Sequence, residues 1–236
     1  MADPDPTDPL GAVVDRVKVR PGATVVLALA GPVAVGKSTI AGELGTRLRG
    51  LGAGVEVVST DGFLLPNAAL EAQGLLDRKG CPETYDLGRL EALVASARDG
   101  RSLLEVPLYS HERYDVLADP EQIDRPDVLV VEGVVALQRP FADLGIYVHA
   151  DEADVIAWYV ARFQGLVRAA GDDPTSFYRG WVDLDDAAVA DLARAVWDGV
   201  NRPNLHEHIA PTRAAADVVV HKGSDHRILS VEWMDP

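Results

Sequence analysis

The sequence has one cysteine, few basic residues and no long apolar run, and each scarcity excludes a class of protein. Cys81 is the only cysteine among 236 residues, so no disulfide can form within the chain and nothing indicates an oxidising compartment. Lysine and arginine number 22 against 37 aspartates and glutamates; the net charge of −15 argues against binding to nucleic acid or an anionic membrane surface. No apolar run approaches the roughly 18 residues that span a bilayer. We therefore expect a soluble, cytoplasmic protein.

The first nine residues, MADPDPTDP, have neither the basic region nor the apolar region of a signal peptide. We expect residues 1–9 to form a disordered acidic lead-in. Residues 10–236 suit a single domain, and a hydrophobic content of 47% is enough for a sizeable core. No internal repeat or long low-complexity segment divides them.

An apolar run at residues 24–30 leads directly into the octet GPVAVGKS at residues 31–38. This octet is a G-x-x-x-x-G-K-S phosphate loop, in which backbone N–H groups face the phosphates, the lysine reaches the outer phosphates and the serine binds Mg²⁺. The helix predicted to follow would add its positive N-terminal end. The sequence thus predicts a nucleoside triphosphate site; the alternative is a loop retained by a protein without turnover. The expected nucleotide-binding residues are Gly31, Pro32, Val33, Ala34, Val35, Gly36, Lys37, Ser38 and Thr39.

Strand-like and helix-like segments alternate along the whole chain. The predicted strands are 24–30, 55–59, 103–108, 127–131, 145–149, 215–221 and an edge strand at 227–233. The predicted helices are 37–50, 66–74, 86–99, 152–169 and 185–200, after a short amphipathic stretch at 10–19. Such alternation predicts an α/β fold with a mostly parallel sheet and helices on both faces. The polar segment 109–126 is expected to be a surface excursion over the site.

Ligands of open parallel sheets bind beyond the carboxyl ends of the strands. Three predicted strand ends bring Asp61, His111 and Glu132 to one rim. Asp61 suits the task of accepting the proton of an acceptor hydroxyl; alternatively it is a helix cap or turn residue. Glu132 suits a Mg²⁺ ligand beside Ser38, directly or through water; alternatively it caps the next segment.

Tyr159 and Arg162 are three residues apart in a predicted helix and therefore share a face that could close over a substrate. An arginine there would stabilise charge on the phosphoryl group in transfer; the alternative is an aromatic packing stripe with a solvated arginine. His111, flanked by Tyr109 and Tyr114, is either a structural histidine or part of a polar substrate wall.

Taken in order, several segments resemble the bacterial type I pantothenate kinases, in the phosphoribulokinase/uridine kinase group of P-loop enzymes. The similarity runs from about residue 24 onward. The segments are 31–39 (GPVAVGKST), 60–67 (TDGFLLPN), 78–86 (RKGCPETYD), 107–111 (PLYSH), 114–115 (YD), 126–133 (PDVLVVEG), 158–159 (WY), 162–163 (RF), 204–205 (NL), 211–213 (PTR) and 222–226.

The resemblance implies a P-loop NTPase fold, the use of ATP and Mg²⁺, and phosphorylation of the primary hydroxyl of pantothenate at the start of coenzyme A synthesis. Asp61 would be the catalytic base, acting with Lys37 and Arg162. His226 would lie against the adenine, and substrate lids would lie near 109–126 and 152–180. The residues implied to hold pantothenate are Asp61, Tyr109, His111, Tyr114, Tyr159, Arg162 and Asn204.

The chain also departs from that family. Its members have an N-terminal extension that helps form the adenine site and a homodimer, and here only some two dozen residues precede the match. Gly42 and Leu166 stand where the family has an arginine and an aromatic residue that contact its inhibitor coenzyme A, so weak or absent inhibition is expected. The same changes are compatible with another acceptor.

The alternative function keeps the phosphoryl transfer and changes the acceptor to a nucleoside, a sugar or a hydroxy acid. A nucleotide-driven switch is disfavoured because the chain has no N-K-x-D guanine motif and because Asp61 is placed to activate a hydroxyl. A catalytically dead binding protein would be expected to lack one of Lys37, Ser38, Asp61 and Glu132, and all four are present.

Overall fold

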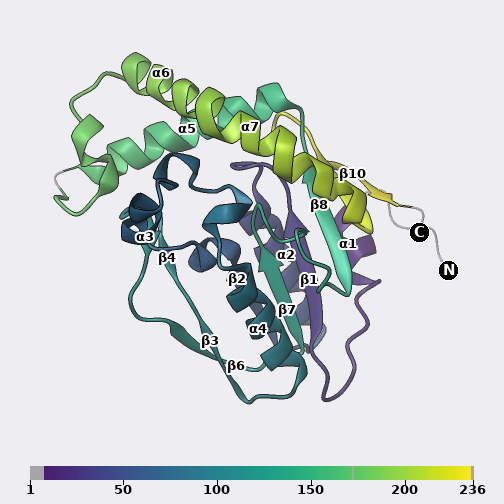
Figure 1. Ribbon diagram of the computed structural model, residues 1–236. Helices are drawn as coiled ribbons and strands as arrows, with labels where there is room; N and C mark the ends of the chain where they lie inside the picture. The colour runs from purple at the N-terminus through teal and green to yellow at the C-terminus, as the bar shows by residue number, and fades with distance from the viewer. Residues whose placement is uncertain (1–7, 172, 235–236) are drawn as a thin grey trace.

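The computed structural model describes residues 8–171 and 173–234, and a six-stranded sheet in the order β10-β9-β8-β1-β7-β2 forms its centre (Figure 1). All neighbouring strands are parallel except β10, which pairs antiparallel with β9 at one edge. The strands of this sheet are β1 (Val25–Ala30), β2 (Val55–Ser59), β7 (Val128–Glu132), β8 (Leu144–His149), β9 (Val218–Lys222) and β10 (Ile228–Trp233). The predicted α/β P-loop NTPase fold is confirmed, including the edge strand.

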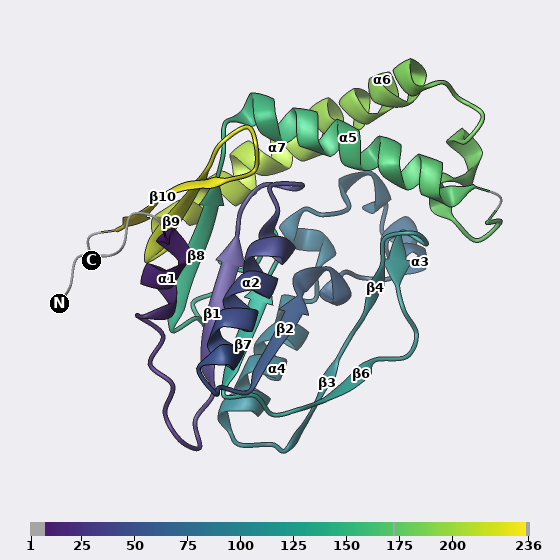
Figure 2. The ribbon, with the colours of Figure 1, turned by 180° about the vertical axis from the view of Figure 1, so that it is seen from behind.

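Helices cover both faces of this sheet. Figure 2 shows α1 and α2 against one face, and Figure 1 shows α4 against the other. The run from α5 to α7 crosses above the carboxyl ends of the strands (Figure 1). The described α-helices are α1 (Pro9–Val14), α2 (Lys37–Gly50), α3 (Asn67–Ala72), α4 (Leu87–Arg98), α5 (Glu152–Ala170), α6 (Asp186–Val196) and α7 (Arg202–Asn204). Within the described part of the chain, no helix is long and apolar enough to span a bilayer.

The central strand β1 lies between β7 and β8 and sets the register of the site. All five residues of β7 are buried, as its unbroken apolar sequence predicts for a strand covered on both faces. Leu29 of β1 and Ser59 of β2 both align with Glu132 at the end of β7. The strands β1, β2 and β7 therefore end at the same edge of the sheet. The phosphate loop follows β1, the Asp61 segment follows β2, and Glu132 ends β7.

The predicted strand 103–108 was wrong in its placement, because it does not join the central sheet. β3 (Leu103–Val106) pairs antiparallel with β6 (Glu121–Asp124), and β4 (Tyr109–Ser110) pairs with β5 (Asp115–Val116). Leu103 is 57% exposed and Leu104 only 2%, the alternation of a ribbon covered on one face. The segment 109–126, expected as a surface excursion, contains the short strands β4, β5 and β6.

The predicted helix 185–200 is the start of a longer helical run. After α6 the chain makes π-helical turns at Trp197–Asn201 and Leu205–Ile209, on either side of α7, and then a 3-10 stretch at Ala210–Ala215. Pro203 lacks the backbone N–H that a regular α-helix would use at its position, which favours an irregular turn there.

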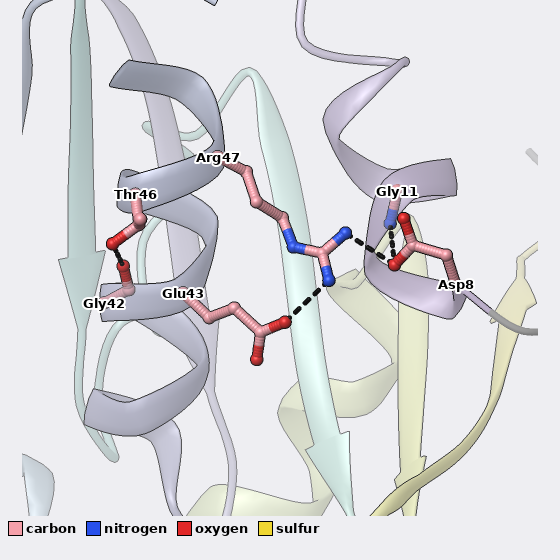
Figure 3. Close-up of polar contacts among 6 residues, drawn as sticks. All are labelled: Asp8, Gly11, Gly42, Glu43, Thr46 and Arg47. Carbon is pink, nitrogen blue, oxygen red and sulfur yellow. Dashed lines mark hydrogen bonds and ion pairs between the residues drawn. The ribbon is translucent and has the colours of Figure 1, made fainter. Parts of the chain in front are cut away.

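The N-terminal helix α1 is tied to α2 by the side chain of Arg47. Its guanidinium contacts both Asp8 and Glu43, and the Asp8 carboxylate also accepts from the Gly11 backbone N–H (Figure 3). These charged groups are a third or more exposed, so each pair contributes only about 0–1 kcal/mol. Asp8 and Pro9 thus belong to α1 and its cap rather than to a disordered lead-in, and residues 1–7 lie outside the described residues.

Gly42 lies on the exposed side of α2, where its carbonyl accepts from the Thr46 hydroxyl at 2.9 Å (Figure 3). It offers no side chain to a ligand above the phosphate loop. Leu166 packs beside the smaller apolar cluster formed by α5 and α6. Weak or absent inhibition by coenzyme A stays a prediction.

Gly133, directly after β7, is required by its surroundings. Its φ is +152°, and a Cβ at this position would overlap the hydroxyl of the buried Thr60. We expect Gly133→Ala to lower the free energy of unfolding by about 2–4 kcal/mol, through strain and overpacking together.

Urea denaturation of the wild-type protein and of Gly133→Ala measures this effect. Gly165→Ala is the matched control, because Gly165 is exposed in α5 with open space around its Cα, and alanine there should raise stability by about 0.5–1 kcal/mol. Equal effects of the two substitutions would contradict the close approach of Gly133 to Thr60.

Candidate active site

The phosphate loop is held by two lysine side chains that donate to its own carbonyls. Lys37 Nζ donates to Pro32 O, and Lys222 Nζ, from the end of β9, donates to Val35 O, each at 2.8 Å. Burial lowers the pKa of Lys37, and the negative charges of Glu132 and Asp61 oppose that shift. The loop therefore presents a buried cation whose charged form the carboxylates of Glu132 and Asp61 favour.

Glu132 lies against the loop serine. Ser38 Oγ donates to Glu132 Oε1 at 2.9 Å, and Glu132 is only 6% exposed. Burial raises the pKa of Glu132, while Lys37 and the hydrogen bond from Ser38 act in the opposite direction. Its carboxylate therefore contacts the phosphate loop instead of capping the next segment.

The oxygens of Ser38 and Glu132 are of the kind that Mg²⁺ prefers. Mg²⁺ usually takes one or two protein oxygens and completes its shell with water and substrate phosphates. The described residues contain no cluster of three or more His, Cys, Asp or Glu side chains able to hold a metal without such help. The donor set thus fits a magnesium ion that arrives with a nucleotide.

Asp61 does not act as the cap of its own helical turn. The 3-10 helix Thr60–Phe63 is capped by Ser59, whose Oγ accepts from the Asp61 backbone N–H at 3.3 Å. The Asp61 carboxylate instead lies 3.9 Å from His111 Nε2. The next residue, Gly62, has no room for a Cβ beside the Pro107 carbonyl, so residues 107–111 pack directly on the Asp61 segment.

This packing explains how His111 reaches the rim although its strand is outside the central sheet. Arg162 Nη2 lies 3.2 Å from His111 Nε2. The Tyr109 ring packs edge-on against the imidazole, with 5.1 Å between the two ring centres. Burial and the charge of Arg162 lower the pKa of His111, and Asp61 opposes them. Because a guanidinium can only donate, Nε2 of the neutral imidazole accepts.

A second group of side chains extends away from Asp61. The Tyr114 ring stacks on the Phe177 ring, with 4.4 Å between the ring centres, and the Tyr114 backbone has a φ of +53°. Lys79 Nζ lies 4.1 Å from the Tyr114 ring centre. Burial raises the pKa of Tyr159, against the effect of the Asn201 side chain, and Asn204 Nδ2 donates to Gly80 O at 2.7 Å. These aromatic and amide groups, with a lysine among them, form the wall we call the acceptor wall: Lys79, Tyr109, Tyr114, Tyr159 and Asn204.

His226 lies apart from these two groups. It has a φ of +67° and stacks on Trp158 of α5 at 4.1 Å. Lys222 lies 5.3 Å from the Trp158 ring centre and also contacts the phosphate loop. Among the described contacts, His226 is therefore linked to the loop through Trp158 and Lys222.

The sequence analysis missed two lysines of the site. Burial lowers the pKa of Lys79 to about 8, against the opposing charges of Asp115 and Asp61. Lys222 ends the buried strand β9 just as Glu132 ends β7, so the strand-end rule could have found it. Nothing local marks Lys79, because its burial depends on Tyr114 and Asn67, which lie far from it in the sequence.

The sequence of this chain is similar to a known family and to named relatives. The model of the Phosphoribulokinase / Uridine kinase family matches residues 26–164. A pantothenate kinase from Sorangium cellulosum is 45% identical over 87% of this chain and 71% of its own length. A pantothenate kinase from Limosilactobacillus fermentum is 42% identical over 86% of this chain and 70% of its own length.

A solved structure gives the same result for the fold. A kinase provisionally assigned to a fructose transport system, from Silicibacter sp. TM1040, superposes with a TM-score of 0.68 at 26% identity. The match covers 91% of this chain and 96% of that one. This chain thus shares its arrangement of sheet and helices with that protein.

Proposed function

The chain belongs to the Phosphoribulokinase / Uridine kinase family and uses ATP, and we propose that it phosphorylates the primary hydroxyl of pantothenate. The observation that carries the proposal is the meeting, at one rim, of the Ser38–Glu132 pair with the Asp61–His111–Arg162 group. The site for the phosphoryl donor, ATP, then lies beside Asp61, a carboxylate able to accept the proton of the acceptor hydroxyl. The identity of 42–45% to proteins named pantothenate kinase supports the choice of acceptor.

In the proposed reaction Asp61 accepts the proton as the acceptor oxygen bonds to the γ-phosphorus, the bond from phosphorus to the bridging oxygen breaks, and ADP leaves. Lys37 exchanges its contact with Pro32 O for the outer phosphates. Arg162 stabilises negative charge on the transferring group. His111 accepts from Arg162 through Nε2 and so orients the guanidinium beside Asp61.

Ser38 and Glu132 would hold Mg²⁺, which, when bound, neutralises charge on the phosphates. The backbone N–H groups of the loop orient the phosphate chain. Glu132 stays close to Lys37, whose positive charge favours the ionised carboxylate despite burial.

The acceptor wall is suited to a small flexible polar molecule. Lys79 offers a buried positive charge to a carboxylate, and the Tyr109 and Tyr114 rings shield that charge from water. Tyr159 and Asn204, in the same wall, would offer hydrogen bonds to the acceptor. We place His226 and Trp158 at the nucleotide end, beside Lys222.

An ADP-release assay tests the proposal. The purified chain with ATP and Mg²⁺ is given pantothenate, a nucleoside, fructose or glycerate, each at equal concentration. We expect acceptor-dependent release with pantothenate preferred at least 100-fold in kcat/KM. ADP release that no acceptor stimulates would indicate a nucleotide switch, and preference for another alcohol would retain the kinase but replace its substrate.

We further propose a cytoplasmic location, where ATP is available, and a homodimer. Light scattering measures the oligomeric state directly, and a mass near 25 kDa would identify a monomer instead of a dimer.

A further inference from the structure

Ser59, the last residue of β2, aligns with Glu132, the last residue of the neighbouring parallel strand β7. Aligned residues of parallel strands project from the same face of the sheet, on strands about 4.8 Å apart. Val57, on the same face as Ser59, points toward α2, because a Cβ on Gly45 of that helix would lie 3.5 Å from it. Ser59 therefore points toward the start of α2, the side from which Ser38 donates to Glu132.

The residues that follow Ser59 and Glu132 in the two segments are also packed together. A Cβ on Gly133 would overlap the hydroxyl of Thr60, which is fully buried. The two segments therefore meet at successive positions, with no space between Thr60 and Gly133 for one segment to slide past the other. The turn that carries Asp61 is thus packed on the end of the strand that carries Glu132.

The hydroxyl of Ser59 can accept one hydrogen bond and donate another. Its Oγ accepts from the Asp61 backbone N–H at 3.3 Å and so caps the 3-10 helix Thr60–Phe63. Its own hydrogen remains to be donated, and the Glu132 carboxylate lies on the side toward which Ser59 points. The Ser59 side chain also lowers the pKa of Glu132, as a hydroxyl facing an ionised carboxylate would.

We propose that Ser59 is a positioning residue whose single hydroxyl holds both carboxylates of the site, accepting from the backbone of Asp61 and donating to Glu132. The carboxylate that takes the proton and the one that would hold Mg²⁺ then keep a fixed separation. This inference rests on the proposed function, in which both carboxylates act on the same phosphoryl group. Because Ser59 acts through them, we expect it to affect the transfer step and not the binding of the acceptor.

Ser59→Ala removes both contacts. With saturating ATP and Mg²⁺, we expect kcat for pantothenate phosphorylation to fall roughly 5- to 50-fold while the KM for pantothenate stays within about twofold of the wild-type value. Ser59→Thr keeps the hydroxyl and should restore kcat to within about threefold. The added methyl group has room, because Ser59 is exposed and borders a cavity of about 230 Å³. Ser230→Ala, exposed in β10, is the matched control and should change neither constant.

Two binding measurements without turnover report on the two contacts separately. For Glu132, calorimetry at constant pH measures how much Mg²⁺ strengthens ADP binding; Ser59→Ala should reduce this gain roughly 3- to 30-fold and leave metal-free ADP binding unchanged. For Asp61, NMR measures the pKa of His111, which the nearby Asp61 carboxylate raises. If Asp61 moves away in Ser59→Ala, the His111 pKa should fall.

The inference requires both binding measurements to change in Ser59→Ala and to recover in Ser59→Thr. A lower His111 pKa with an unchanged Mg²⁺ gain would mean that Ser59 only caps the 3-10 helix, and it would overturn the inference. An unchanged His111 pKa, or a Ser59→Thr enzyme as slow as Ser59→Ala, would overturn it as well. A wild-type enzyme that does not phosphorylate pantothenate would overturn the proposed function, whereas the two binding measurements would still decide the role of Ser59.

Discussion

Asp61→Asn is expected to lower kcat for pantothenate phosphorylation by about 10²- to 10⁴-fold while the affinity for ATP changes little. Asparagine preserves the size of the side chain and its hydrogen-bonding reach, but it cannot take the hydroxyl proton. Ser59, not Asp61, caps the 3-10 helix, so the turn should persist in the variant. Rapid-quench kinetics for the chemical step and equilibrium titration with an ATP analogue measure the two quantities.

His111 supplies an independent readout of the same substitution. The negative charge of Asp61 raises the His111 pKa, although burial and Arg162 lower it overall. Asp61→Asn should therefore lower the His111 pKa further, as followed by NMR titration of the imidazole. The exposed Asp119→Asn is the control. An unaffected kcat would remove Asp61 from the catalytic role.

Arg162→Met is expected to lower kcat by about 10²- to 10³-fold, because the Arg162 guanidinium lies at the rim, beside His111 and within electrostatic range of Lys37. Methionine keeps much of the side-chain length and volume without the charge. The His111 pKa should rise in this variant, the opposite of its change in Asp61→Asn, because the positive neighbour is gone.

A control in the same helix isolates the role of this charge. Arg168 also lies in α5 but forms an exposed ion pair with Asp186, so Arg168→Met should leave kcat unchanged. Arg162→Lys should recover only part of the activity, since a lysine cannot reproduce the planar contact of the guanidinium. Equal losses in Arg162→Met and Arg168→Met would indicate a general effect on α5.

The sequence predicts the nucleotide half of the fold because its signals are local. The predicted helix 37–50 has the bounds of α2, and the apolar run predicted as strand 127–131 lies one residue from β7. Both depend on short-range patterns: a glycine-rich loop that opens a helix, and a strand buried on both faces. The fold class follows from their alternation.

The acceptor half depends on contacts between distant segments, which a single sequence does not display. His111 reaches Asp61 because Gly62 packs on Pro107, and not because its strand joins the sheet. Lys79 is buried by Tyr114, 35 positions later. The π-turns on either side of α7, which ends at Asn204, give no periodic signal, and the role of Asn204 stays a prediction.

The most direct test of the account is the product formed by the wild-type enzyme from ATP and pantothenate, identified by two-dimensional phosphorus–proton NMR. The account predicts a single phosphate ester whose phosphorus couples to the methylene protons of the primary alcohol carbon, formed in equal amount to ADP. Inorganic phosphate without an ester, or an ester on the secondary hydroxyl, would contradict it.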